Sequence, residues 1–146
     1  MSRKKIRLLV DVLMVVFIAI AMLGWRGHRP LHIFIGSACT LLFIIHVILN
    51  SRVLASFTKS IAKGKASVKI KLQCLIDYLL IIVWAITIIT GFLALSARFG
   101  GAASLLVFSR VHGVAAWVGC VIVLIHFIQH IKQIRSYLVR KPDKLI

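Results

Sequence analysis

Four histidines form two pairs with the same spacing, and each pair lies in an apolar stretch. Thirteen residues separate His32 from His46, and thirteen separate His112 from His126. On an α-helix, fourteen steps rise ~21 Å and end within ~40° of four whole turns, so each helix would present two imidazoles on nearly one face. Polar side chains of this kind are costly inside a membrane and usually bind something there. Two such helices side by side would offer two bis-imidazole sites at different depths, which suits two haem irons.

The composition predicts an integral membrane protein. The chain has 146 residues, of which 61% are hydrophobic, and its mean hydropathy is +1.03. A soluble domain of this size needs far more polar surface. The formal net charge of +16 could also serve nucleic acid, but almost all the bases lie outside the apolar stretches. We therefore expect membrane lipids as partners and no nucleic acid.

The apolar stretches predict an all-α, integral membrane four-helix bundle with up-down-up-down topology, formed by a single domain over residues 1–146. The expected spans are roughly 8–24, 31–50, 72–97 and 105–130. Residues 51–71 form a basic cytoplasmic connection, in which 57–71 is either an amphipathic helix on the inner leaflet or a solvated loop. A third connection is expected near 98–104, and the last helix is expected to end near Pro142.

The bases give these helices a direction. Fifteen of the 19 Lys and Arg residues lie before the first span, in the second connection or in the tail. The other four are Arg26, Arg29, Arg98 and Arg110. The positive-inside rule then places both termini in the cytoplasm. The second and fourth helices both run inward, so His32 and His112 would lie near the outer face. His46 and His126 would lie near the inner face, and the depths match pairwise as bis-axial ligation requires.

Small residues accompany the candidate ligands. Gly36 lies one turn after His32, and Gly113 and Gly119 follow His112. They would let a flat macrocycle approach the helix backbone. Ordinary close packing between helices explains small residues equally well.

Basic residues near the ligands are candidate partners for haem propionates. Arg29 and Arg110 lie close to the outer ligands, and Arg52 and Lys132 lie close to the inner ones. The alternative is that each side chain extends toward lipid headgroups.

Several polar residues remain. His130 lies one turn beyond His126 on the same face and is the alternative inner ligand, a propionate partner or part of a proton path. His28 precedes Pro30 and is expected outside the helix. Asp11 and Asp77 should interact with a helix N-terminus or a nearby base, and quinone protonation is the alternative.

The pattern resembles the membrane cytochromes b, and more narrowly the short four-span cytochromes associated with flavinylated extracytoplasmic electron-transfer systems of bacteria. The stretches that carry the resemblance are Arg29–His32 through Gly36, His46–Asn50, and His112 with Gly113 through His126. The resemblance implies two haem b groups. It makes His32 with His112 the outer axial pair, and His46 with His126 the inner one.

The resemblance also implies partners and a location. Electrons would pass between a quinone or another cytoplasmic-side donor and an extracytoplasmic redox partner protein, which could be flavinylated. The chain would lie in the bacterial cytoplasmic (inner) membrane. It would be an electron-transfer subunit rather than a stand-alone enzyme, with quinol as one candidate substrate.

Two alternatives stay open. The first is a membrane-anchor cytochrome b subunit of a dehydrogenase or hydrogenase complex. The second is a non-redox scaffold, or a transporter of protons or metal. Histidines fourteen positions apart on one helix cannot share a metal ion, which counts against a single compact metal centre. The three cysteines, Cys39, Cys74 and Cys120, form no C-x-x-C motif, so covalent haem attachment is not expected.

Overall fold

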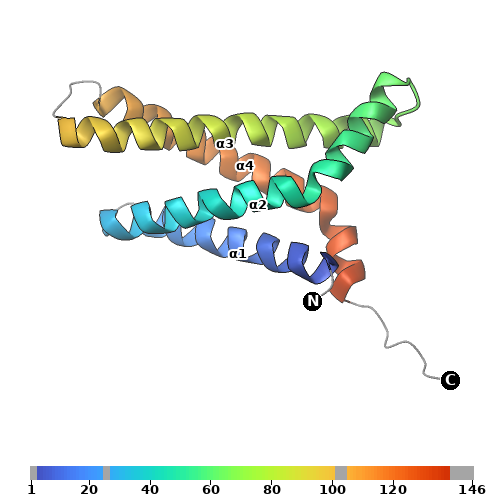
Figure 1. Ribbon diagram of the computed structural model, residues 1–146, viewed down its shortest axis with the longest axis horizontal. Coiled ribbons are helices and arrows are strands. Elements are labelled where there is room, and N and C mark those ends of the chain that lie inside the picture. The colour runs from blue at the N-terminus through green and yellow to red at the C-terminus, as the bar shows by residue number, and fades with distance from the viewer. Residues whose placement is uncertain (1–2, 25–26, 101–104, 139–146) are drawn as a thin grey trace. The chain divides into compact units, whose positions relative to one another are not determined.

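The computed structural model describes residues 3–24, 27–100 and 105–138, which form four α-helices (Figure 1). The helices are α1 (Arg3–Gly24), α2 (Arg29–Ala62), α3 (Val68–Gly100) and α4 (Leu105–Leu138). Each contains a segment long and apolar enough to cross a membrane. The prediction of an all-helical chain with four membrane-spanning helices is confirmed to that extent. The expected end of the last helix near Pro142 lies outside the described residues.

The sequence between α1 and α2 explains the turn there. α1 ends at Gly24, and Pro30 is the second residue of α2, where the N–H that proline lacks would have no partner within the helix. The backbone N–H of His28 donates to the Gly24 carbonyl at 3.1 Å, and that of His32 donates to the His28 carbonyl at 3.0 Å. His28 is exposed and lies outside both helices, as predicted.

The basic connection at residues 51–71 contains neither a separate helix over 57–71 nor a loop of that length. α2 continues to Ala62 and α3 begins at Val68, so residues 63–67 are all that separate the two helices. Gly64 has a φ of 68°, in the left-handed region that ends a helix without strain for glycine. The Ser67 hydroxyl accepts a hydrogen bond at 3.4 Å from the backbone N–H three residues on, which is the pattern of a helix N-cap. Both helices therefore extend from apolar sequence into the basic segment.

Few side chains of the described residues are buried. The buried apolar side chains are Val10, Met14, Cys39, Phe43, Cys74 and Leu80. No polar or charged side chain of the described residues is fully buried, and many large apolar ones are exposed. This distribution suits a surrounding lipid phase, in which exposed apolar side chains carry no penalty.

The chain divides into two compact units, Met1–Ala55 and Ser56–Ile146. In the first unit, α1 and most of α2 form an antiparallel hairpin. A guanidinium Nη of Arg7 donates to the Leu49 carbonyl at 2.7 Å. Because Arg7 lies early in α1 and Leu49 far along α2, this contact fixes the antiparallel direction.

The second unit contains the end of α2 together with α3 and α4. α3 and α4 form another antiparallel hairpin (Figure 1). The end of α2 joins it through Thr58, whose hydroxyl lies 3.0 Å from the Tyr78 hydroxyl of α3. Each unit thus pairs one histidine-bearing helix with the helix before it in sequence: α2 with α1 in the first unit, and α4 with α3 in the second.

Candidate functional site

The second histidine of each pair contacts a carboxylate on the partner helix. In the first unit, His46 Nδ1 lies 2.7 Å from Asp11 Oδ1. In the second unit, His126 Nδ1 lies 2.9 Å from Asp77 Oδ1. The same pair of side chains therefore meets in both hairpins, and all four side chains are at least partly shielded from solvent.

The first histidine of each pair contacts a backbone carbonyl instead. His32 Nδ1 lies 2.8 Å from the Ala21 carbonyl oxygen, and His112 Nδ1 lies 2.8 Å from the Thr87 carbonyl oxygen. Ala21 follows the aspartate of α1 by ten residues, and Thr87 follows the aspartate of α3 by ten residues. The two hairpins therefore repeat the same register as well as the same contacts.

These contacts assign a role to each ring nitrogen. A carbonyl oxygen or an ionised carboxylate only accepts hydrogen bonds, so in a neutral imidazole Nδ1 must carry the proton. Nε2 then holds the lone pair, and it is the atom able to bind iron. Histidines that bind metals usually donate their other N–H to a carbonyl or carboxylate, which orients the ring and raises its basicity. All four predicted ligands show this arrangement, so each of these imidazoles fits the role of an axial ligand to haem iron.

Gly91 makes room for one of these rings. A Cβ at this position would lie 3.0 Å from both Cε1 and Nδ1 of the His112 imidazole, so the ring would have to shift by a few tenths of an ångström. Gly24 lies 13 residues after Asp11, nearly as Gly91 lies 14 residues after Asp77, but a Cβ at Gly24 would come no closer than 3.9 Å to its nearest neighbour, the backbone nitrogen of His32. The two glycines therefore serve different purposes.

The three glycines predicted beside the ligands have different surroundings. A Cβ at Gly36 or Gly113 would meet no atom within 4 Å, so both positions border open space. A Cβ at Gly119 would lie 3.5 Å from Cγ1 of Val83, which is ordinary packing between α3 and α4. Gly119 is thus a helix-packing residue, and contact of Gly36 and Gly113 with a macrocycle stays a prediction.

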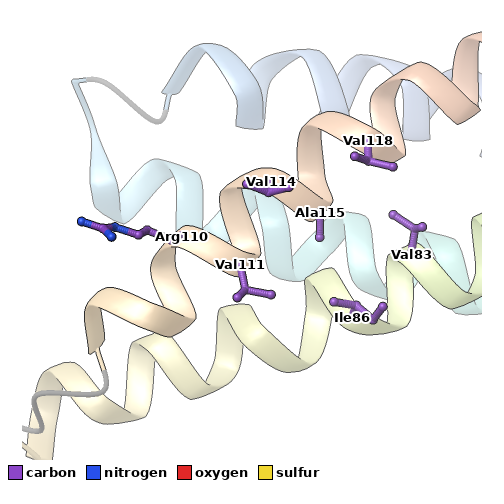
Figure 2. A pocket seen from close by; sticks show the side chains of 7 residues that line it. All are labelled: Val83, Ile86, Arg110, Val111, Val114, Ala115 and Val118. Atoms are coloured by element: carbon purple, nitrogen blue, oxygen red, sulfur yellow. The ribbon is translucent and has the colours of Figure 1, made fainter.

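The predicted propionate partners lie on exposed positions of their helices. Arg29 is the first residue of α2, and Arg110 is exposed near the start of α4. Arg110 borders an apolar groove of about 360 Å³ between α3 and α4, and Figure 2 shows its side chain pointing away from the valines. Besides Arg110, the lining residues are Val83, Ile86, Val111, Val114, Ala115 and Val118. Arg110 and His112 lie about 200° apart around α4, and a role for either arginine at a propionate stays a prediction.

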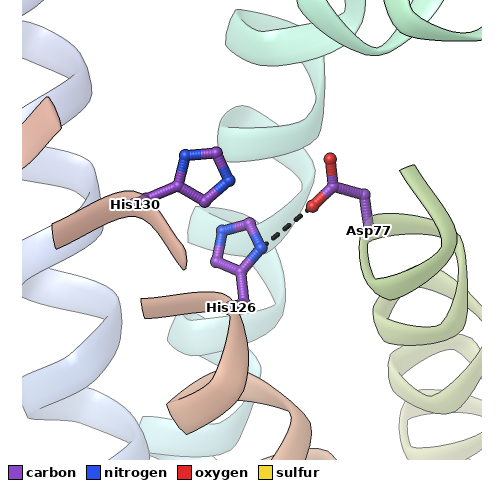
Figure 3. A group of neighbouring side chains, drawn as sticks. All are labelled: Asp77, His126 and His130. Atoms are coloured by element: carbon purple, nitrogen blue, oxygen red, sulfur yellow. Dashed lines mark hydrogen bonds and ion pairs between the residues drawn. The ribbon is translucent and has the colours of Figure 1, made fainter. Parts of the chain in front are cut away.

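His130 lies beside His126 in the second unit. Its ring centroid lies 4.6 Å from that of His126, with the rings tilted by 44°. One ligand atom from each of Asp77, His126 and His130 lies within 4.8 Å of the others (Figure 3). The sequence-based argument against a compact metal centre considered only histidines fourteen apart, and it missed this group because the aspartate comes from another helix.

The contact partners of the two aspartates differ from those that the sequence predicted. The sequence interpretation expected each to interact with a helix terminus or a base, whereas Asp11 and Asp77 contact the second histidines. A signal was present: each aspartate lies near the end of its helix that an antiparallel hairpin brings beside the second histidine.

Each predicted axial pair takes one histidine from each unit, so the pairing itself stays a prediction. Comparison of the chain with protein-family models, with curated proteins and with solved structures finds no significant match.

Proposed function

We propose that this protein transfers electrons across a membrane by means of two b-type haems. His32 and His112 would hold one haem, and His46 and His126 the other. The observation that carries the proposal is the repeated Nδ1 contact: four imidazoles, two in each hairpin, have their rings oriented by an acceptor 2.7–2.9 Å away. When bound, haem supplies a one-electron carrier whose iron alternates between the ferric and ferrous states.

The chain's own residues make the two sites chemically different. A backbone carbonyl orients each first histidine without adding charge. A carboxylate orients each second histidine and makes its imidazole a stronger electron donor. Stronger donation favours ferric iron, so the site of His46 and His126 should have the lower reduction potential. An electron would then move more favourably from the second histidines toward the first than in the opposite direction.

The charge distribution supports the direction of this path. With 15 of 19 bases assigned to one side, both termini would lie in the cytoplasm, and the second histidines would lie toward the cytoplasmic side. We propose the bacterial cytoplasmic membrane as the location. A quinone or cytoplasmic-side donor and an extracytoplasmic redox protein are the proposed partners, with the anchor subunit of a larger dehydrogenase or hydrogenase as the alternative.

Haem content and ligand replacement test the proposal. The full-length protein, produced with haem supplied and purified in detergent, should show two haems per chain and a reduced spectrum with b-type α bands. His46→Ala and His126→Ala should each remove the same haem, and His32→Ala and His112→Ala the other. His130→Ala is the matched control on α4, and it should retain both.

Two results would contradict the proposal. Folded protein without haem would exclude the function altogether. If His46→Ala and His126→Ala removed different haems, the predicted pairing would be wrong even though haem is bound.

A further inference from the structure

We infer that Asp77, His126 and His130 form a binding site for a divalent transition-metal ion in the haem-free protein. The three side chains come from one hairpin, with the carboxylate in the first third of α3 and both imidazoles in the last part of α4. In Figure 3 the His126 ring faces the aspartate and the His130 ring lies beside the His126 ring, and one ligand atom from each residue lies within 4.8 Å of the others. All three residues are partly exposed, although the His130 Nε2 atom is itself buried.

One of the three distances between ligand atoms already matches that of a bound metal, and the others lie within 4.8 Å. Bonds of about 2.0–2.2 Å to nitrogen and oxygen place neighbouring ligand atoms about 2.9–3.4 Å apart, depending on the coordination geometry. His126 Nδ1 and Asp77 Oδ1 are already 2.9 Å apart. Only His130 must move closer to the other two ligand atoms, from within 4.8 Å to about 3 Å. Rotation of its side chain can supply this shift. An ion would take the place of the proton that His126 and Asp77 now share in their hydrogen bond.

The sequence spacing and donor types also suit a metal ion. His126 and His130 are four residues apart on α4, so their side chains lie on one face one turn apart, as in helical histidine pairs that bind zinc. Two imidazoles and one carboxylate form a donor set for Zn²⁺ and neighbouring divalent ions, and water would fill the remaining positions. The carboxylate also supplies negative charge in a chain that is otherwise strongly basic.

The first unit provides an internal comparison. It has the same aspartate–histidine contact, between Asp11 and His46, but Asn50 stands four residues after His46 where the second unit has His130. The Asn50 side-chain N–H donates to the His46 carbonyl at 2.9 Å, and the same nitrogen lies 3.4 Å from His46 Nδ1, where an amide nitrogen offers no lone pair to a metal ion. Among the described residues, a group of three close metal-ligating side chains is found in the second unit and not in the first.

Occupancy by this ion should exclude haem at the same histidine, a consequence that rests on the proposed function. The ion would bind His126 through Nδ1, the atom that faces Asp77. The proton of the neutral ring then moves to Nε2. Haem ligation requires the reverse arrangement, with the proton on Nδ1 and the lone pair on Nε2. A neutral His126 can therefore serve either the ion or the haem.

Titration of the full-length, haem-free protein in detergent micelles with Co²⁺ tests the site. The wild-type chain should bind one ion that gives d–d absorption without the intense bands of a thiolate ligand, and Zn²⁺ should displace it. His130→Asn, which gives the second unit the residue of the first, should weaken Co²⁺ binding at least about tenfold. Asn50→His should add a second bound ion, and replacement of the exposed His28 by alanine should change nothing.

The result that overturns the site is an absence of Co²⁺ binding at millimolar concentration by folded wild-type protein, or unchanged affinity in folded His130→Asn. Haem loading is measured separately. Preloading with Zn²⁺ should block uptake of one haem in the wild type and of none in His130→Asn. If the wild type retained Zn²⁺ while binding two haems, the exclusion argument would fail and the metal site would stand. If neither protein bound haem, the proposed function would fail, and the Co²⁺ result would still decide the metal site.

Discussion

Replacement of Asp77 by asparagine should raise the reduction potential of one haem by about 50 mV. The Asp77 carboxylate is 18% exposed and accepts a hydrogen bond from His126 Nδ1 at 2.9 Å. Hydrogen bonds to charged groups contribute about 1.5–3 kcal/mol, against about 0.5–1.5 kcal/mol for neutral ones. The midpoints of these ranges differ by about 1.2 kcal/mol, which corresponds to about 50 mV for one electron when it acts on the ferric state. The potential rises because the variant ring donates less electron density to ferric iron.

The aspartate of the other unit makes this a test of the pairing as well. Asp11→Asn should raise the potential of the same haem, because His46 and His126 are predicted to share one iron. Its effect should be smaller, since the Asp11 side chain is 38% exposed and its charge is better screened by solvent. The double variant should show roughly the sum of the two shifts.

Spectroelectrochemical titration of the purified protein, monitored at the reduced α bands, measures both potentials. Thr87→Ala is the control, because it keeps the backbone carbonyl that His112 contacts, and neither potential should change. Shifts in two different haems would refute the pairing across units. Unchanged potentials in folded Asp77→Asn and Asp11→Asn would refute the role assigned to the carboxylates.

Two further predictions concern the first histidines and the topology. Gly91→Ala should reduce occupancy of one haem, because the added Cβ would lie 3.0 Å from the His112 ring. The control, Gly24→Ala, should retain both haems. Haem-to-protein ratios measure the difference, and equal ratios in the two variants would contradict the prediction. For the topology, single cysteines are introduced into a variant in which serine replaces Cys39, Cys74 and Cys120. In intact cells, an impermeant maleimide should label Gly27→Cys from outside and leave Lys65→Cys unlabelled. The opposite pattern would reverse the proposed orientation.

The sequence was sufficient to predict four helices of membrane-spanning length because long apolar stretches separated by Gly, Pro and charged residues determine them locally. It was less informative about residues 51–71. There, basic composition suggested a loop or a separate helix, although the chain has no helix breaker between Asn50 and Ala62 and simply continues α2.

The contacts of the site required the structure. The candidate ligands were identifiable from spacing alone, but Asp11 lies 35 residues from His46, and Asp77 lies 49 residues from His126. Which faces of two antiparallel helices meet depends on their packing and rotation, and the sequence pattern of largely apolar helices leaves both undetermined. For the same reason the environment of the His112 ring, including Gly91, could not be anticipated.

The two kinds of imidazole partner should differ in how they respond to mutation. The carbonyls that orient His32 and His112 belong to the main chain, so they persist whatever side chain occupies the position. This protein already uses alanine at one of these positions, Ala21, and threonine at the other, Thr87. The carboxylates are side chains, and no other residue except glutamate carries one. Random substitution would therefore leave the orientation of the first histidines largely intact, while the second histidines would be the point at which this protein loses or retunes its chemistry by a single change.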